Sequence, residues 1–545
     1  MNAQSELARL RTFTLWRALN DAAARNLKRV ALVGADDGGE ISRLSYAELL
    51  ARIRELSAGL AAIGVRRGDR LVLWMTNTLE WVICAFATMR IGAAVVPVNT
   101  FLKPPEIKYF IEQSGARHLI MIDGFRALKM PALLAQICSA VTSAKTPGFL
   151  FSHELPELRN VVLFGRAGAK MDCAFDFAAL AAHASPQAHE LADRMQSETQ
   201  ATDLAMIKYT SGSTAFPKGV MLEHGGIVAN AVLHSRRMGV DGSDTYFSMM
   251  PFFHAGGSIY GLMTMLLNGG TLVFTEAFNA ALAAELVRSE RATVFVTMLG
   301  DEVVQAALAK GYVFESLRLA DVRSEAARKV MPNVKTCFHA FGLTETYGPV
   351  ALSSYAVGNC DIAGARPLEG NEARIVDPDT LQDLPPGAPG ELLVRGNLTR
   401  GYWNKPLETA KAFTQDGWFR SEDLVSIDNN GCLTWHGRLK LMLKIGGENV
   451  SIEEVERVVT GHESVAACCG VGVPDQRKRE AMRLYVQTHS AHTLSETELL
   501  AWLKPRLAHF KLPREIVLLD ALPRLGSGKV DRVHLANRAK SEVSA

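Results

Sequence analysis

The sequence predicts an α/β protein. We expect a large N-terminal domain of parallel-type sheets with covering helices, a small β-rich subdomain, and a small α+β domain at the C-terminal end. With 545 residues, the chain is longer than a single hydrophobic core supports. Strand and helix patterns alternate through most of it, which is typical of parallel sheets covered by helices. Short strands separated by turns such as LPPGAPG then replace this alternation.

The N-terminal half shows the alternation most clearly. Residues 44–64 carry apolar side chains at three- and four-residue steps and end at Gly64, which predicts a helix. The stretch 71–99 predicts a buried strand, a helix and a second buried strand. It contains Glu80 and Arg90, whereas a membrane span needs about 20 predominantly apolar residues. Residues 104–122 repeat the helix-then-strand scheme.

The C-terminal part has a different texture. RIVDP, GELLVRG and RGYWN predict short strands of a β-rich subdomain over about 365–436. The mixed pattern after it predicts the α+β domain. We place the boundary at Lys440, which gives an N-terminal domain over 1–439 and a C-terminal domain over 440–545.

Composition excludes several classes of protein. Hydrophobic residues make up 48% and charged residues 21%, as in ordinary globular enzymes, and the net charge of +2 gives no basic footprint for nucleic acid. The N-terminus lacks the apolar core of a signal peptide, so we expect a cytoplasmic protein without a transmembrane segment. None of the eight cysteines forms a CxxC pair, which favours buried free thiols over a zinc site or disulfides.

The stretch YTSGSTAFPKG, residues 209–219, has the composition of a phosphate-binding loop. It is not a Walker A motif, because Gly219 follows Lys218 where a magnesium-binding hydroxyl would be needed. A Ser/Thr-rich turn is the plain alternative. The stretch can still hold a polyphosphate through hydroxyl groups, free backbone N–H groups and the lysine charge. The residues concerned are Thr210, Ser211, Gly212, Ser213, Thr214 and Lys218.

Four more stretches follow it along the chain: FGLTE at 341–345, GWFRSEDL at 417–424, GRLKLMLKIGGENV at 437–450 and LPRLGSGKVDR at 522–532. With the first, they form a series that resembles the signatures of the adenylate-forming superfamily. This family includes acyl-CoA synthetases, adenylation domains of peptide synthetases and firefly luciferase. Residues 45–115 resemble its N-terminal region. One such string is weak evidence, but five in the family's order are specific.

The resemblance implies an acid–CoA ligase that uses ATP, Mg²⁺ and coenzyme A. It would activate a carboxylic acid as acyl-AMP with release of pyrophosphate, and then pass the acyl group to the CoA thiol with release of AMP. Two alternatives stay open: loading of a separate carrier protein, and a nucleotide- or acyl-binding homologue with impaired catalysis. The expected partners are small molecules, and a homo-oligomer is compatible with the sequence.

The resemblance also implies roles for residues around the nucleotide. Glu345 would bind Mg²⁺, since this ion prefers a hard carboxylate together with phosphate oxygens. Thr344 would contact the phosphate, and Phe341, where the family usually has Tyr, would stack on adenine. Asp423 would accept hydrogen bonds from the two ribose hydroxyls, and Arg438 would add ribose or phosphate contacts.

Lys529 is the candidate for adenylation itself. The reacting carboxylate and the α-phosphate are both anions, and two unit charges ~4 Å apart repel by roughly 4 kcal/mol at an effective dielectric constant of about 20. A cation on the glycine-flanked GSGK loop would offset this repulsion. In the family, a mobile C-terminal domain turns between the two steps, with its hinge here at Lys440. In the second arrangement, Gly446 and Gly447 would line the tunnel for the thiol, although a plain β-turn also favours two glycines.

The acid is expected to bind at PFFHAGGSIYG, residues 251–261. His254 matches a family histidine near the acyl carbonyl, and aromatic side chains would form an apolar wall. This segment contains no Lys or Arg, so we expect a neutral, apolar monocarboxylic acid whose exact identity, fatty, alicyclic or aryl, stays open. The candidate residues are Phe252, Phe253, His254, Gly256 and Tyr260.

Three departures from the family pattern concern the nucleotide site. Ala215 replaces a glycine of the phosphate loop. Glu422 replaces the glycine that usually precedes Asp423, which puts the local backbone geometry in doubt. The glycine-rich strand that contacts adenine in the family is missing between 317 and 341, and we expect Asp321–Arg323 to fill in for it.

Overall fold

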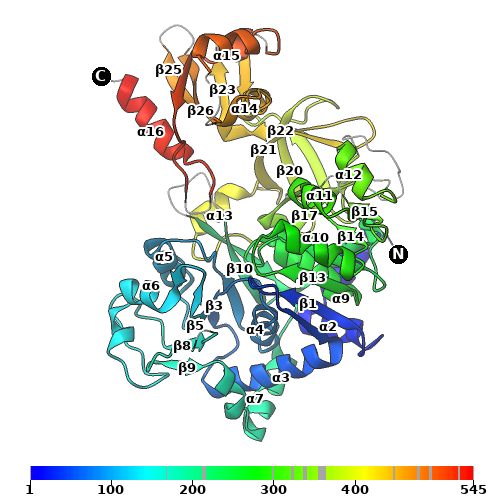
Figure 1. Ribbon diagram of the computed structural model, residues 1–545, viewed down its shortest axis with the longest axis vertical. Coiled ribbons are helices and arrows are strands. Elements are labelled where there is room, and N and C mark those ends of the chain that lie inside the picture. The colour runs from blue at the N-terminus through cyan, green and yellow to red at the C-terminus, as the bar shows by residue number, and fades with distance from the viewer. Residues whose placement is uncertain are drawn as a thin grey trace. The chain divides into compact units, whose positions relative to one another are not determined.

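The structure is a computed structural model with two compact units (Figure 1). The first unit comprises Met1–Glu372 and Arg395–Gly417, and the second comprises Ala373–Val394 and Trp418–Ala545. The domain boundary expected at Lys440 stays a prediction. The structure describes residues 2–166, 168–210, 217–296, 300–320, 324–334, 340–353, 364–445, 448–475, 479–489, 494–507, 509–525 and 528–543.

A seven-stranded sheet forms one half of the first unit. Its strands pair in parallel except at the edge, where β10 and β11 are antiparallel. The predicted strand–helix–strand over 71–99 is confirmed as β3, α4 and β4. In spatial order the strands are β11 (Lys218–Glu223), β10 (Leu204–Thr210), β4 (Ala94–Pro97), β3 (Arg70–Trp74), β5 (His118–Ile122), β8 (Asn160–Phe164) and β9 (Ala174–Asp176).

A six-stranded sheet forms the other half of this unit. It is parallel apart from the pairing of β1 with β2. The two sheets contribute to one continuous hydrophobic core, so the expected parallel sheets with covering helices are confirmed. In spatial order the strands are β15 (Leu319–Ala320), β14 (Val294–Phe295), β12 (Thr245–Ser248), β13 (Thr271–Thr275), β1 (Val30–Ala35) and β2 (Ile41–Ser45).

Helix α3 shows how local sequence sets an element. It begins after Ser45, whose hydroxyl accepts from the Glu48 N–H while the Glu48 carboxylate accepts from the Ser45 N–H. It packs against α4 and α7 (Figure 1), and its bounds, Tyr46–Ala62, confirm the predicted helix. The other helices of the unit are α1 (Ala3–Leu10), α2 (Leu15–Ala23), α4 (Leu79–Arg90), α5 (Pro104–Ser114), α6 (Met130–Ile137), α7 (Pro186–Glu198), α8 (His224–Met238), α9 (Thr264–Asn268), α10 (Ala280–Ser289), α11 (Gly300–Ala309), α12 (Glu325–Val330) and α13 (Pro406–Ala412).

An aromatic contact joins the two halves of the first unit. Trp81 of α4 lies 5.2 Å from Phe252, and Phe252 lies 4.9 Å from Phe274 of β13, measured between ring centroids. Nearly every residue of α4 is buried, as expected for a helix that is apolar on all sides. Helix α4 therefore links β3 and β4 of the seven-stranded sheet along the chain, and through Trp81 and Phe252 it also packs towards β13 of the six-stranded sheet.

The second unit contains two antiparallel-type sheets. A four-stranded sheet is formed by β19 (Glu372–Val376), β20 (Gly390–Arg395), β21 (Phe419–Ile427) and β22 (Leu433–Arg438). Strand β27 (Glu515–Leu519) adds in parallel to β26 at the edge of the other sheet. That sheet also contains β23 (Met442–Ile445), β24 (Glu448–Ser451), β25 (Val465–Asp475) and β26 (Arg479–Thr488), with helices α14 (Ile452–Thr460), α15 (Glu496–Leu503) and α16 (Arg532–Val543).

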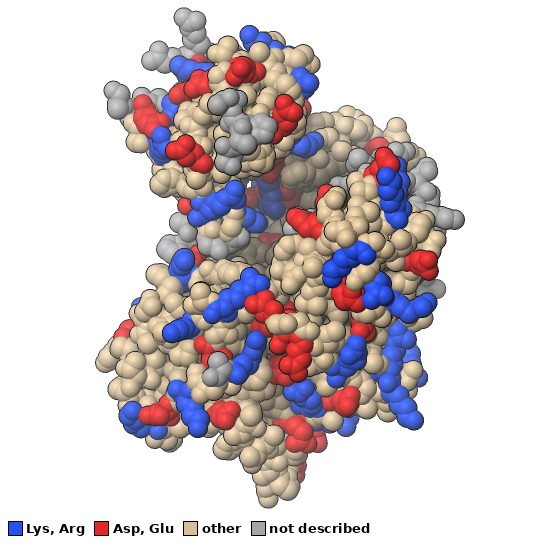
Figure 2. Space-filling view, viewed as in Figure 1, with Lys and Arg blue, Asp and Glu red and all other residues tan. Residues whose placement is uncertain are grey.

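The described cysteines agree with the free thiols that the sequence predicts. Basic and acidic side chains are interspersed over the face that Figure 2 shows. The six described cysteines carry free thiols, and all but Cys468 are buried. Within the described ranges, we find no helix that combines the length and the apolar character needed to cross a bilayer.

Candidate active site

The phosphate-binding stretch joins two paired strands. Thr210 at the end of β10 lies opposite Lys218 at the start of β11. The ring of Tyr209 stacks on Phe110 with centroids 4.1 Å apart, and the Tyr109 hydroxyl donates to the Pro217 carbonyl at 2.9 Å. Both flanks of the stretch are thus fixed on α5. Ser211, Gly212, Ser213, Thr214 and Ala215 lie outside the described residues, as do Asp321–Arg323.

The FGLTE motif lies on a tight hairpin. Strand β16 (Ala340–Leu343) pairs with β17 (Gly348–Leu352), and a short 3-10 turn, Thr344–Thr346, connects them. A Cβ atom on Gly342 would lie 2.2 Å from the Gly348 carbonyl oxygen, so only glycine fits there. Phe341 and Thr344 are half-buried, and the hairpin turn carries Glu345 into a buried position.

Tyr402, a residue outside the five sequence motifs, contacts both Glu345 and Lys218. The Tyr402 hydroxyl donates to Glu345 Oε1 at 2.9 Å, and Lys218 Nζ lies 4.3 Å from the centroid of the same ring. Tyr402 is only 4% exposed. The backbone N–H of Thr399 donates to the Glu345 carbonyl at 2.8 Å. The structure therefore brings a carboxylate, a phenol and a lysine together beside the phosphate-binding stretch.

The segment that contains Tyr402 was predicted as a strand, RGYWN, and this prediction is wrong. Tyr402 makes one isolated bridge to Val220 of β11, and the Trp403 N–H donates to the Gly219 carbonyl at 2.8 Å. The segment pairs with the edge of the seven-stranded sheet and belongs to the first unit. Alternating apolar letters cannot distinguish such an edge contact from a strand of a β-rich sheet.

The expected acid-binding segment runs into a π-helix, η3 (Gly256–Met263), a form often found at functional sites. Phe252 is fully buried in the aromatic contact described above, Phe253 is half-buried, and His254 is exposed and accepts from the Gly256 N–H at 3.1 Å. The Tyr260 ring lies 4.1 Å from the imidazole of His234. The binding roles of these residues stay predictions.

Asp423 and Arg438 lie together in the second unit. They are paired residues of β21 and β22, and Arg438 Nε forms an ion pair with Asp423 Oδ1 at 2.8 Å. The indole N–H of Trp435 donates to the same oxygen at 3.2 Å. Asp423 is only 1% exposed, so its carboxylate is held in one orientation.

Glu422 explains why the family pattern has glycine before this aspartate. Its φ is +57°, in the left-handed region that favours glycine. A non-glycine residue there costs about 1–2 kcal/mol. The backbone keeps the glycine geometry despite the substitution, and Asp423 stays in position.

The remaining candidates also belong to the second unit. Lys529 is exposed, and its carbonyl accepts from the Leu525 N–H at 2.8 Å in a turn that contains Gly528 with φ +83°. Lys440 lies in the short helix Leu439–Leu441 that follows β22. Gly446 and Gly447 lie outside the described residues.

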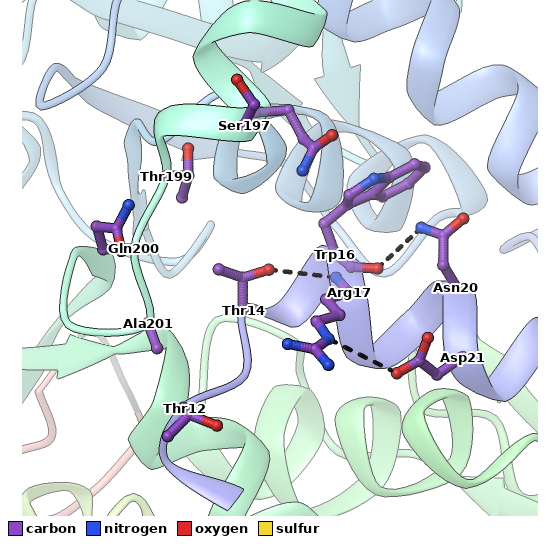
Figure 3. Close-up of a pocket in the computed structure, with 11 residues that line it drawn as sticks. Thr12, Thr14, Trp16, Arg17, Asn20, Asp21, Ser197, Thr199, Gln200 and Ala201 are labelled. Carbon is purple, nitrogen blue, oxygen red and sulfur yellow. Dashed lines mark hydrogen bonds and ion pairs between the residues drawn. The ribbon is translucent and has the colours of Figure 1, made fainter.

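A hollow of about 410 Å³ elsewhere in the first unit contains none of the predicted site residues. It lies between α2 and the end of α7 (Figure 3). Its polar groups serve local structure: the Thr14 hydroxyl caps α2 by accepting from the Arg17 N–H, and Arg17 forms a 4.0 Å ion pair with Asp21. We therefore do not assign it to the active site.

Comparisons with known proteins agree with these motifs. Family models match residues 19–403 as an AMP-binding enzyme and residues 454–529 as the AMP-binding enzyme C-terminal domain. YngI of Bacillus subtilis, provisionally named an acyl-CoA synthetase, is 31% identical over 98% of each chain. The rat mitochondrial medium-chain acyl-CoA ligase ACSF2 is 30% identical over 97% of this chain and 88% of its own. The fold also matches ATP-bound MatB from Rhodopseudomonas palustris, with a TM-score of 0.75, 24% identity and coverage of 99% and 100%.

Proposed function

The chain belongs to the adenylate-forming superfamily of AMP-binding enzymes and is a ligase of the acyl-CoA synthetase type, and from this premise we propose that its substrate is an apolar monocarboxylic acid. The carboxylate attacks the α-phosphate of ATP, which forms acyl-AMP and releases pyrophosphate. The CoA thiol then attacks the acyl carbon, which forms the thioester and releases AMP. The observation that carries the ATP-dependent step of this proposal is the contact of Tyr402 with both Glu345 and Lys218 beside the phosphate-binding stretch.

In this proposal the described residues of the first unit bind the phosphates. Lys218 and the Thr210 hydroxyl contact phosphate oxygens, and Thr344 contacts the same group from the FGLTE hairpin. Glu345 suits Mg²⁺, because its carboxylate is buried and oriented by the Tyr402 hydroxyl. Glu345 would hold the ion there, and a bound Mg²⁺ would supply positive charge that offsets the charge of the polyphosphate.

In the second unit, the buried Asp423 carboxylate would accept from the ribose hydroxyls. Arg438 and Trp435 support this role, because their contacts fix the direction of the carboxylate. Lys529 would approach the reacting carboxylate and the α-phosphate during adenylation, Lys440 would act as the hinge, and Gly446 and Gly447 would line the thiol tunnel. Phe341 would stack on adenine.

Two observations support an apolar monocarboxylic acid. The segment 251–261 has aromatic and apolar side chains and no cationic ones, and the ACSF2 relative is named for medium-chain acids. A panel of acids with ATP, Mg²⁺ and CoA tests the proposal by AMP release. We expect medium-chain or cyclic monocarboxylic acids to exceed dicarboxylic acids of equal length at least about tenfold in kcat/KM, because an unpaired buried charge is costly.

Other outcomes of the same panel would contradict the proposal. If dicarboxylic acids are the better substrates, the substrate class is wrong. If AMP release requires a holo-carrier protein in place of CoA, the acceptor is wrong. If no acid supports pyrophosphate exchange, the chain binds nucleotide or acyl groups without this catalysis.

Tyr402→Phe tests whether the hydrogen bond from Tyr402 to Glu345 contributes to adenylation. The variant keeps the ring but loses the hydroxyl that donates to the carboxylate. Hydrogen bonds to charged groups contribute about 1.5–3 kcal/mol, so we expect pyrophosphate exchange to fall about tenfold and the Mg²⁺ requirement to rise. Tyr312→Phe is the matched control, because the Tyr312 hydroxyl donates to Glu285 at 2.6 Å outside the site. An equal loss in both variants would disprove a role for Tyr402 in the site.

A further inference from the structure

Strand β10 carries a buried lysine, Lys208, two residues before Thr210. It is only 3% exposed, and its Nζ donates to the Phe253 carbonyl at 2.9 Å and to the Phe252 carbonyl at 3.3 Å. Burial alone lowers the pKa of this amine to about 7. The tertiary structure thus brings an amine to the backbone of a segment that contains no cation of its own.

Lys208 is unusual because no described carboxylate pairs with it, whereas the buried cation Arg90 of the same unit pairs with Asp193. A buried ammonium group without an anionic partner is strongly unfavourable. An apolar side chain would fill this position in the core without such a penalty. The two carbonyl contacts are therefore what the lysine adds to the structure.

These contacts fix the backbone just before His254. The segment is also bound from another side, since the Asn77 side chain accepts from the Phe252 N–H at 2.8 Å and donates to the Met250 carbonyl at 3.1 Å. Asn77 follows β3, and Lys208 belongs to β10, so two strands of the seven-stranded sheet support one short segment. Strand β10 continues directly into the phosphate-binding stretch.

We propose that Lys208 is a positioning residue for acid binding, which holds the Phe252 and Phe253 peptide groups, and with them His254, in fixed register with the strand that leads to the phosphate-binding stretch. This inference rests on the proposed function. The lysine contacts only backbone carbonyls and acts on the acid through them. Its loss should therefore weaken the use of the acid more than the use of ATP.

The test compares Lys208→Met with Lys208→Gln by steady-state kinetics of AMP release. Methionine keeps the unbranched chain and removes the donors, and it leaves the Phe252 and Phe253 carbonyls without the lysine donor. We expect its KM for the acid to rise about tenfold or more, with the KM for ATP within about twofold. Glutamine retains an N–H₂ donor and should recover most of the loss. Arg90→Met is the control, because it removes another buried cation away from this segment.

Each result supports or overturns the inference. Equal changes in both KM values, a loss confined to kcat, or a glutamine variant no better than methionine would show that Lys208 only supports the fold. If Lys208→Met is insoluble, Lys208→Gln decides by itself: its residual loss should lie in the KM for the acid, and a rise of the KM for ATP as large as that for the acid, or a loss confined to kcat, overturns the inference. If the wild-type protein uses no acid at all, the proposed function fails and this inference fails with it.

Discussion

Lys529→Ala is expected to lower thioester formation from free acid by about a hundredfold to ten-thousandfold. Adenylation brings two anions together, and their repulsion of roughly 4 kcal/mol at ~4 Å must be offset by a positioned cation. Alanine removes that cation. The exposed lysine lies in a turn and makes no described side-chain contact that holds the fold, so we expect the variant to remain folded. Pyrophosphate exchange measures the loss.

The second half-reaction makes this prediction specific. Acyl transfer from a preformed acyl-AMP to CoA needs no contact between the acid and ATP, so the Lys529→Ala variant should keep it within about threefold. Lys504→Ala, which removes an exposed lysine of the same unit, should leave both half-reactions unchanged. Intact thioester formation from free acid, or an equal loss of both half-reactions, would exclude Lys529 as the adenylation cation.

Lys208→Met is expected to change the pH dependence of stability. The folded-state pKa of about 7 lies below the ordinary lysine value of 10.5. Between these values, the unfolded chain keeps a proton that the folded protein has released, so stability of the wild type rises with pH in this window. The full difference corresponds to about 5 kcal/mol. Relative to Lys208→Met, the wild type should therefore gain stability between pH 7 and about pH 10.

Urea unfolding of both proteins at several pH values measures this difference. The other titratable groups contribute equally to the pH dependence of stability in both proteins, so their contributions cancel in the comparison. Among them are His224 and His234, whose pKa values burial lowers to about 4 and about 3, and Tyr46, whose pKa burial raises. The free energy of unfolding of Arg90→Met should change with pH as steeply as that of the wild type across this window, because arginine stays charged throughout. A wild-type-to-Met difference that stays constant from pH 7 to pH 10 would contradict a neutral amine in the folded protein.

The local sequence determines much of this protein. Residues 44–64 predict α3 because apolar side chains recur at three- and four-residue steps and the run ends at Gly64. Residues 71–99 predict a strand, a helix and a strand because the apolar runs are short and broken by polar residues. The five motifs in their family order identify the superfamily for the same reason, since each is a contiguous string. Asp423 and Arg438 were selected from separate motifs, and the register of β21 and β22 pairs them.

Only the tertiary structure decided which distant residues meet. Tyr402 contacts Glu345 and Lys218 because its segment pairs with β11, and Lys208 reaches the carbonyls of 252 and 253 because β10 lies beside that segment. In the sequence, nothing distinguishes Tyr402 from other aromatic residues or Lys208 from other lysines. Hydrogen bonds and burial act between groups that are near in space, and chain folding sets that nearness independently of the local pattern.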